Sequence, residues 1–154
     1  MDSIPVIGTA VVNAPHWVYR LFYSIDYPVD NFIVFNNNGR DQITRELDAL
    51  KEVPHAFVKN VKVCHLPANL GCSGAWNLII KSAMLSPYWL ITNHDIMFAP
   101  GFLKAMKEKA DDPDTGIVHG LNGSWDVFLL KDWVVQNFGL FDENLYPGYC
   151  EDMD

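Results

Sequence analysis

Short runs of apolar, β-branched residues alternate along this chain with stretches whose apolar residues recur at helical spacing. Runs of this kind are typical of buried strands, whereas a spacing near 3.6 residues predicts amphipathic helices. The strands expected from the pattern are 4–12, 31–36, 61–66, 88–92, 116–119 and 125–130. The helices expected between them lie near 15–25, 43–50, 73–84 and 100–110, with a short last helix that Gly139 ends. Strands that alternate with helices predict an α/β domain with a mostly parallel sheet and helices on both faces.

Polar residues mark the expected helix starts and the carboxyl ends of the strands. Asn13, Ser73 and Asp132 each precede a helical pattern, so each is expected to cap a helix by accepting hydrogen bonds from backbone amides. In sheets of this class, ligands bind outside the carboxyl ends of the strands, at the point where the strand order reverses. The segments that directly follow strands are rich in Asn and Gly, which predicts a binding edge at 13, 36–39, 67–74 and 93–95.

The charge distribution narrows the possible partners. The 154 residues carry a formal net charge of −8, and all of it falls on residues 82–154, which hold twelve acidic and four basic side chains. Binding to nucleic acid needs a basic stripe, and the chain has none. An acidic half can hold a phosphorylated ligand when a divalent cation lies between them. The alternative is that most of these acids only keep the surface soluble.

Hydropathy and cysteine content indicate the compartment. No apolar run approaches the roughly 20 residues that span a bilayer, and the first residues form no signal peptide. The three cysteines are too few and too scattered for a disulfide framework. We therefore expect a soluble cytoplasmic protein with no transmembrane segment.

Two acidic positions are candidates for chemistry. Asp95 lies just past a strand, two residues after Asn93, where a carboxylate can hold Mg²⁺ or Mn²⁺ and leave positions for phosphate oxygens. The alternative is a turn in which Asp95 bonds its own backbone. Glu151 and Asp152 follow aromatic residues and a Pro-Gly turn, a setting in which one carboxylate can act as a general base. The alternative there is a frayed acidic tail.

Other motifs are less specific. The loop 67–74 contains glycines before a helix, and helix-start amides can face an anion, but the loop lacks the Gly-Lys-Ser/Thr of a P-loop. No Gly-x-Ser-x-Gly elbow occurs. Trp76 and Trp125 lie near the expected binding edge, where either can stack on a sugar or pack in the core.

Taken in order, these motifs resemble the inverting glycosyltransferases of the GT-A fold, in the large family that includes rhamnosyl- and glucosyltransferases. The segment 32–39 is similar to the second strand and its Asp-Asn-Gly turn, and 69–77 is similar to the Asn-x-Gly and Ala-x-Asn segment. The segments 89–95 and 100–103 resemble the Asp-x-Asp region and the Pro-Gly-x-Leu after it. The segments 139–143 and 149–154 resemble the Gly-x-Phe-Asp-Glu and Glu-Asp-x-Asp signatures.

The resemblance implies a GT-A-type, Rossmann-like domain over residues 1–154, with a nucleotide-binding part at about 1–95 and an acceptor part at about 96–154 that further residues complete. It implies transfer of a hexose or deoxyhexose from a UDP- or dTDP-sugar to a glycan or other hydroxyl acceptor. Asp95 holds Mn²⁺ or Mg²⁺ with help from Asn93, Asp152 is the base, and Glu151 and Trp125 contact the acceptor or sugar. The donor-binding residues that it implies are Ala10, Val12, Asn13, Asn37, Asn69, Gly71, Asn77 and Asn93.

This sequence departs from the family pattern at three of these positions. Asn37 replaces the aspartate of the second-strand turn, Asn93 replaces the first aspartate of Asp-x-Asp, and Val12 stands where the family has an aromatic residue. The replacements at 37 and 93, together with the end of the chain two residues past Asp152, favour an alternative function, a catalytically silent domain of the same fold that binds a nucleotide sugar or a partner protein.

Overall fold

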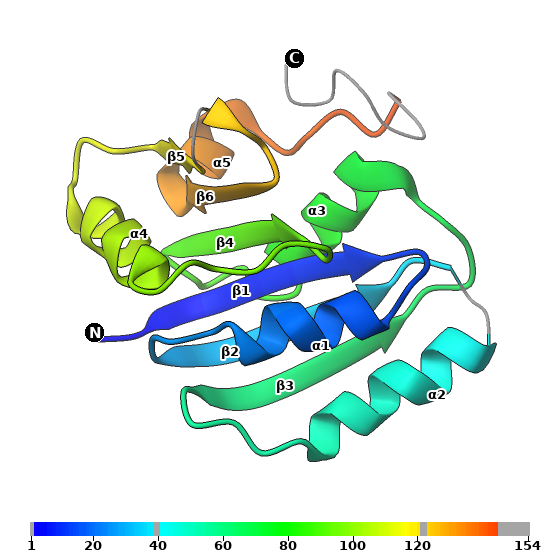
Figure 1. Ribbon diagram of the computed structural model, residues 1–154. Helices are drawn as coiled ribbons and strands as arrows, with labels where there is room; N and C mark the ends of the chain where they lie inside the picture. The colour runs from blue at the N-terminus through cyan, green and yellow to red at the C-terminus, as the bar shows by residue number, and fades with distance from the viewer. Residues whose placement is uncertain (1, 39–40, 121–122, 145–154) are drawn as a thin grey trace.

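Six strands form one sheet in the order β3-β2-β1-β4-β6-β5 (Figure 1). The structure is a computed structural model that describes residues 2–38, 41–120 and 123–144. The strands are β1 (Ile4–Val11), β2 (Val29–Asn36), β3 (Val58–His65), β4 (Tyr88–Asn93), β5 (Ile117–His119) and β6 (Val127–Lys131). Strands β1 to β4 run parallel to one another, and β6 runs antiparallel to its two neighbours β4 and β5. Strands β2 and β3 follow on one side of β1, and β4 lies on the other side, so the strand order reverses between β1 and β4. This reversal is the switch point at which a ligand is expected.

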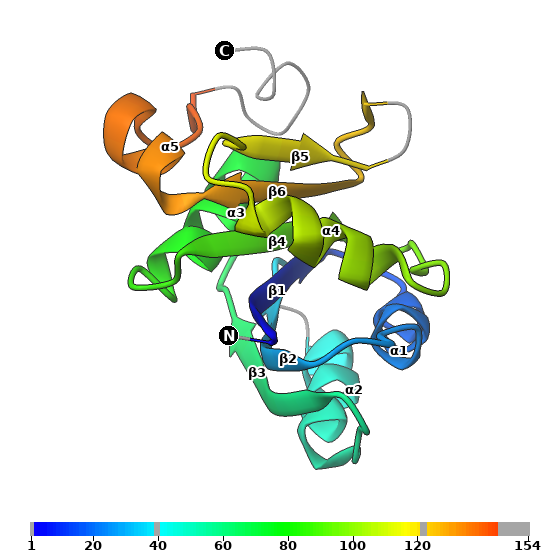
Figure 2. The ribbon, with the colours of Figure 1, turned by 90° about the vertical axis from the view of Figure 1, so that its left-hand side faces the viewer.

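The helices cover both faces of this sheet (Figures 1 and 2). They are α1 (His16–Tyr23), α2 (Asp41–Ala49) with the 3₁₀ turn η1 (Leu50–Glu52), α3 (Gly71–Lys81), α4 (Phe102–Asp111) and α5 (Asp132–Phe138). Residues of α1, α2 and α4 share one apolar core with the sheet, and residues of α3 and α5 share the other. The predicted α/β class, with a mostly parallel sheet and helices on both faces, is therefore confirmed. None of the helices described is long and apolar enough to cross a membrane.

The central strand β1 is buried on both faces, which explains its continuous apolar run. Val6 packs into the α3 side and Ile7 into the opposite side, and both are at most 1% exposed. At Gly8 the sheet and α3 approach so closely that an added Cβ would lie 2.2 Å from the Ile79 Cγ2 atom. Since no side chain fits between them, α3 lies directly against β1, and its first turn comes close to the end of that strand.

The expected caps at Asn13 and Ser73 are wrong, and Asp132 is the first residue of its helix and not the residue before it. Helix α1 has Pro15 at its N-cap, α3 begins at Gly71 two residues before the buried Ser73, and α5 begins at Asp132 after Lys131. No side chain caps α1 or α3, whereas Asp132 Oδ1 accepts a hydrogen bond from the Trp133 amide at 2.8 Å in the first turn of α5. Helix α3 also ends at Lys81 and not near residue 84. A cap contributes only about 1 kcal/mol, so helix ends can differ by one or two residues from the local sequence signal.

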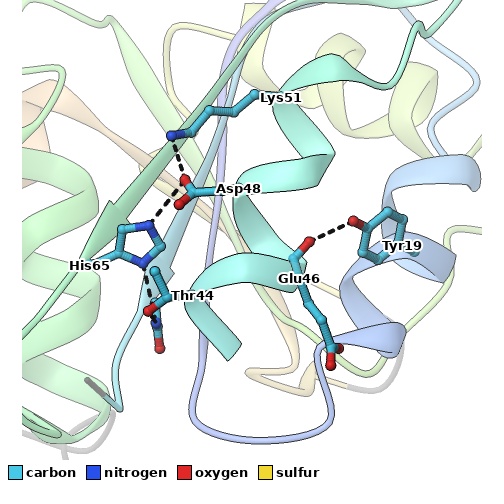
Figure 3. A network of polar contacts seen from close by, with 7 residues as sticks. Tyr19, Thr44, Glu46, Asp48, Lys51 and His65 are labelled. Atoms are coloured by element: carbon cyan, nitrogen blue, oxygen red, sulfur yellow. Dashed lines mark hydrogen bonds and ion pairs between the residues drawn. The ribbon is translucent and has the colours of Figure 1, made fainter. Parts of the chain in front are cut away.

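A polar network attaches α2 to the edge of the sheet (Figure 3). The imidazole of His65 on β3 contacts Asn36 Nδ2 through Nδ1 at 3.2 Å and Asp48 Oδ1 through Nε2 at 3.1 Å. Hydrogen bonds from Lys51 and then His65 lower the pKa of the Asp48 carboxyl. Tyr19 OH donates to the carbonyl oxygen of Glu46 at 2.6 Å, which joins α1 to α2. These contacts hold α2 beside the end of β2, next to the binding edge.

The imidazole of His55 makes folding sensitive to mild acid. Its Nδ1 accepts hydrogen bonds from the amides of Phe57 and Val58, and its ring lies 4.5 Å from the Phe22 ring. Burial lowers the pKa of His55 below 6.5, and a backbone hydrogen bond with Phe22 offsets part of that shift. The unfolded chain therefore binds a proton here more readily than the folded chain as the pH falls through about 6.5.

We expect the melting temperature to fall between pH 7.5 and 5.5. As the pH drops through the pKa that His55 has in the unfolded chain, the unfolded state takes up a proton before the folded state does, and the folded state loses relative stability. The variant His55→Gln should show a shallower fall than the wild type in thermal unfolding. The variant His16→Gln is the control, since His16 is an exposed residue of α1. Equal slopes for His55→Gln and the wild type would contradict this assignment.

Candidate functional site

A cavity of about 270 Å³ lies at the switch point, where β1 and β4 end and α3 begins. It is lined by Ala10, Val12, Asn37, Asn69, Gly71, Cys72, Ala75, Trp76, Thr92, Asn93, His94 and Asp95. Parallel strands bring their carboxyl ends to the same edge, so segments about 80 residues apart in sequence meet here. The cavity is therefore where the binding edge was expected.

The structure brings seven of the implied site residues together in this lining: Ala10, Val12, Asn37, Asn69, Gly71, Asn93 and Asp95. Three others do not line it. Asn13 is exposed just after β1, Asn77 is a buried residue of α3, and Trp125 stacks against Trp76. Glu151 and Asp152 lie outside the described residues, so the expectation that Asp152 converges with Asp95 on one cleft stays a prediction.

Asn37 organises the loop that closes one side of the cavity. Its side chain is 3% exposed, and Nδ2 donates to Asn69 Oδ1 at 3.0 Å and to the carbonyl oxygen of Gly71 at 3.2 Å. Its Oδ1 accepts from the amide of Leu70 at 2.8 Å. An aspartate cannot donate these two bonds. Asparagine, and not the family's aspartate, is therefore the residue that fits this loop, and both polar atoms of the Asn37 side chain are already hydrogen-bonded within it.

The first turn of α3 faces the same space. Gly71, Cys72 and Ala75 line the cavity, no side chain caps the helix, and its first turn contains no acidic residue. Gly71 has a φ of 76°, a conformation that favours glycine, and its amide donates to Asn69 Oδ1 at 2.9 Å. The amino end of a helix carries a partial positive charge and unpaired amides. This end of α3 is therefore suited to an anionic group.

Asn93 is held by Asp126, a residue that the sequence analysis did not select. Asn93 Nδ2 donates to Asp126 Oδ1 at 3.0 Å, and Asn93 N donates to the Asp126 carbonyl oxygen at 2.8 Å. Ser124 Oγ donates to Asp126 Oδ2 at 2.6 Å. Asp126 reaches Asn93 because β6 pairs with β4, and the hydrophobic pattern does not reveal that pairing.

The oxygen donors here fit a hard divalent cation. Within the described residues no three His, Cys, Asp or Glu side chains gather into a metal site. The exposed Asp95 carboxylate nevertheless lines the cavity beside Asn93, whose side-chain nitrogen is bonded to Asp126. Mg²⁺ and Mn²⁺ are bound through one or two such oxygens together with substrate phosphates. The donor set therefore suits a cation that a phosphorylated ligand completes.

The cavity supplies little positive charge from side chains. No Lys or Arg belongs to its lining as far as the chain is described. Burial lowers the pKa of His94, a shift that Asp95 partly offsets and His16 reinforces. His94 is therefore neutral at pH 7. A diphosphate in this cavity needs its charge balanced by helix amides and by a cation.

Trp76 forms one wall of the cavity and belongs to an aromatic cluster behind it. Its ring is 8% exposed, lies nearly parallel to Trp125 at 6.3 Å, and meets Phe128 and Phe141 edge to face at 5.1 Å. Core packing was one of the two alternatives for Trp76, and its side chain is buried in this cluster, but Trp76 also lines the cavity. Trp125 contributes to this wall only by supporting Trp76.

A second cavity of about 450 Å³ lies at the opposite edge of the sheet, near the start of β1 and β4. Its two lysines are already engaged: Lys107 Nζ lies 2.6 Å from Asp111 Oδ1, and Lys131 Nζ donates to the Asp112 carbonyl oxygen at 2.6 Å. The smaller cavity is the better candidate because its polar groups come from the strand ends and the start of a helix.

The comparison with protein families decides the identity of the domain. The model described as Glycosyl transferase family 2 matches residues 7–150. This chain belongs to glycosyl transferase family 2. A galactofuranosyl glycosyltransferase of Leishmania donovani is 29% identical over 120 residues, which cover 73% of this chain and 27% of that protein. The chain thus spans about a quarter of the length of that curated relative.

Solved structures share the family 2 fold seen here. The mannosyltransferase PcManGT from Pyrobaculum calidifontis, in complex with GDP-Man and Mn²⁺, superposes with a TM-score of 0.77 at 14% identity. The comparison covers 93% of this chain and 48% of that one. S. aureus TarS 1-349 superposes with a TM-score of 0.72 at 16% identity, over 99% of this chain and 53% of that one. At these identities the likeness shows the fold, which agrees with the resemblance in the sequence; rhamnosyl or glucosyl transfer does not follow from it.

Proposed function

We propose that this family 2 domain binds a nucleoside diphosphate sugar in the cavity at the ends of β1 and β4 and transfers its sugar, with inversion, to an acceptor hydroxyl. The observation that carries the proposal is the meeting of seven implied site residues in one cavity at the switch point. Family membership adds support. So do relatives solved with GDP-Man and with UDP-GlcNAc, whose folds resemble this one.

The proposed roles follow from position and chemistry. The loop that Asn37 holds, together with Ala10 and Val12, is the proposed nucleoside site at the end of β1 and β2. The amides at the start of α3 are the proposed contacts for the diphosphate. Trp76 shapes the wall against which the sugar would lie. The donor sugar we propose is a hexose or deoxyhexose, carried by UDP or dTDP.

Asp95 and Asn93 would hold Mn²⁺ or Mg²⁺ in this arrangement. Such a cation, when bound, neutralises charge that develops on the leaving diphosphate. Asp95 would supply the carboxylate ligand, and since Asp126 accepts a hydrogen bond from Asn93 Nδ2, the Asn93 side-chain oxygen is the atom that would assist. Because the lining described carries no basic side chain, the domain's own residues would otherwise repel a diphosphate.

Asp152 is the proposed general base. A carboxylate beside the acceptor takes the proton from the attacking hydroxyl, whose oxygen then bonds to the anomeric carbon as the bond to the diphosphate breaks. Attack from the face opposite the leaving group inverts the anomeric centre. Glu151 is the proposed acceptor contact beside it.

A binding screen tests this proposal. UDP, dTDP and GDP are titrated with and without Mn²⁺ by calorimetry, and thermal shift follows the corresponding sugar nucleotides. We expect at least one nucleotide to bind with Mn²⁺, to raise the melting temperature, and to bind about tenfold or more weakly after EDTA is added. If no nucleotide binds, or if EDTA leaves the dissociation constant unchanged, the donor site or its cation is wrong.

A further inference from the structure

Asn77 directs its side chain away from the donor cavity. It follows Trp76 on α3 and is 1% exposed. Asn77 Nδ2 donates to the Phe141 carbonyl oxygen at 2.9 Å and to Glu143 Oε1 at 2.8 Å, and Asn77 Oδ1 accepts from the Phe141 amide at 3.0 Å. Both amide hydrogens and the carbonyl oxygen are thus engaged with the 141–144 segment, which follows α5 (Figure 1).

Neighbouring contacts secure the same segment. Lys81, one helical turn after Asn77, brings Nζ to 3.6 Å from Glu143 Oε1. Both of these side chains are about half exposed, so this ion pair contributes little. The Phe141 ring packs edge to face against Trp76 at 5.1 Å. Helix α3 therefore presents one face to the donor cavity, through Gly71 and Trp76, and another to the 141–144 segment.

We infer that Asn77 is a positioning residue, which clamps the 141–144 segment to the helix that forms the donor site and does not itself contact the donor. This inference rests on the proposed function, in which Asp152 is the base. The clamp ends at Glu143, which precedes Asp152 by nine residues in the sequence, so we expect its loss to affect the transfer step that Asp152 is proposed to serve and not donor binding.

Neither an aspartate nor an alanine can replace this clamp. An aspartate would keep an acceptor for the Phe141 amide but would place a carboxylate against the Phe141 carbonyl oxygen and against Glu143. An alanine would leave the Phe141 amide and carbonyl group without their partner, and a buried unpaired group is costly. Loss of the clamp should free the segment while the cavity lining stays intact.

The test compares Asn77→Ala, Glu143→Ala and the control Asn60→Ala, which changes an exposed asparagine of β3 on the far side of the sheet. Hydrogen exchange of residues 139–144, the dissociation constant of UDP with Mn²⁺, and separate kcat and KM values are measured. Asn77→Ala should speed exchange at 141–144 and lower kcat, each by about tenfold, and leave the UDP dissociation constant and the donor KM within about twofold. Glu143→Ala should act the same way more weakly, since it removes one bond of three, and Asn60→Ala should change neither.

The outcomes separate the clamp from the donor site. If Asn77→Ala weakens UDP binding more than tenfold while exchange at 141–144 is unchanged, Asn77 is a donor contact and the inference is overturned. If wild-type protein binds no nucleotide, the proposed function fails, and exchange alone still decides whether the clamp exists. If Asn77→Ala does not fold, Glu143→Ala decides, because the Glu143 side chain is half exposed and its removal leaves the two bonds between Asn77 and Phe141 in place.

Discussion

Replacement of Asp152 by Asn should reduce the rate of sugar transfer by about 10²–10⁴, the usual contribution of a general base. The two side chains are nearly the same size, but an amide cannot accept the proton from the acceptor hydroxyl. Donor binding should survive, because Asp152 is assigned to the acceptor side. The measurement is product formation from a sugar nucleotide that the binding screen has identified, together with the dissociation constant of its nucleotide.

A matched control lies two residues further along the chain. Asp154→Asn removes a carboxylate from the same acidic stretch and should leave transfer unchanged. Undiminished transfer in Asp152→Asn would reject its role. If the wild-type protein binds a sugar nucleotide but neither transfers nor slowly hydrolyses it with Mn²⁺ present, the chain is the silent binding domain that the replacements at 37 and 93 favour.

Replacement of Asp95 by Ala should remove the dependence of nucleotide binding on Mn²⁺. In the wild-type protein we expect EDTA to weaken UDP binding, because the cavity lining described has Asp95 as its one carboxylate and no basic side chain. Asp95→Ala should bind UDP about 100-fold more weakly than the wild type with Mn²⁺, and equally with and without the metal. Calorimetric titrations of both proteins, with Mn²⁺ and with EDTA, provide the comparison.

Asp114→Ala is the control for this loss of charge, since Asp114 is an exposed residue of the connection between α4 and β5. It should bind UDP as the wild type does. If Asp95→Ala retains a tenfold or larger response to Mn²⁺, the cation is held elsewhere and the assignment of Asp95 is wrong.

Sequence reasoning located the binding edge because that edge depends on order along the chain. Residues that directly follow buried parallel strands must meet at one edge, so Asn37, Asn69 and Asp95 were selected without coordinates, and the cavity contains all three. The same reasoning placed Asn77 and Trp125 at this edge, and neither of them lines the cavity. A motif position shows that a residue lies near a strand end, but not which way its side chain points.

Other features depended on partners far away in the sequence. Asp126 joined the site because β6 pairs with β4 in an antiparallel register, 33 residues from Asn93. The start of α3 was misjudged because Ser73 has the local chemistry of a cap, whereas the helix begins at Gly71 and packs directly against β1. Local preferences near 1 kcal/mol lose to burial of whole side chains.

The alternation of apolar strands and amphipathic helices was enough to determine the α/β class, the parallel core of the sheet and the edge where the cavity lies, since these follow from period and chain order alone. The tertiary structure decided which polar groups are free for a ligand and which are already engaged with the protein. Asn37 is committed to its loop, Asn77 to the 141–144 segment and the Asn93 amide to Asp126. A hydrogen bond has a direction and a length of about 3 Å, and only three-dimensional packing sets both.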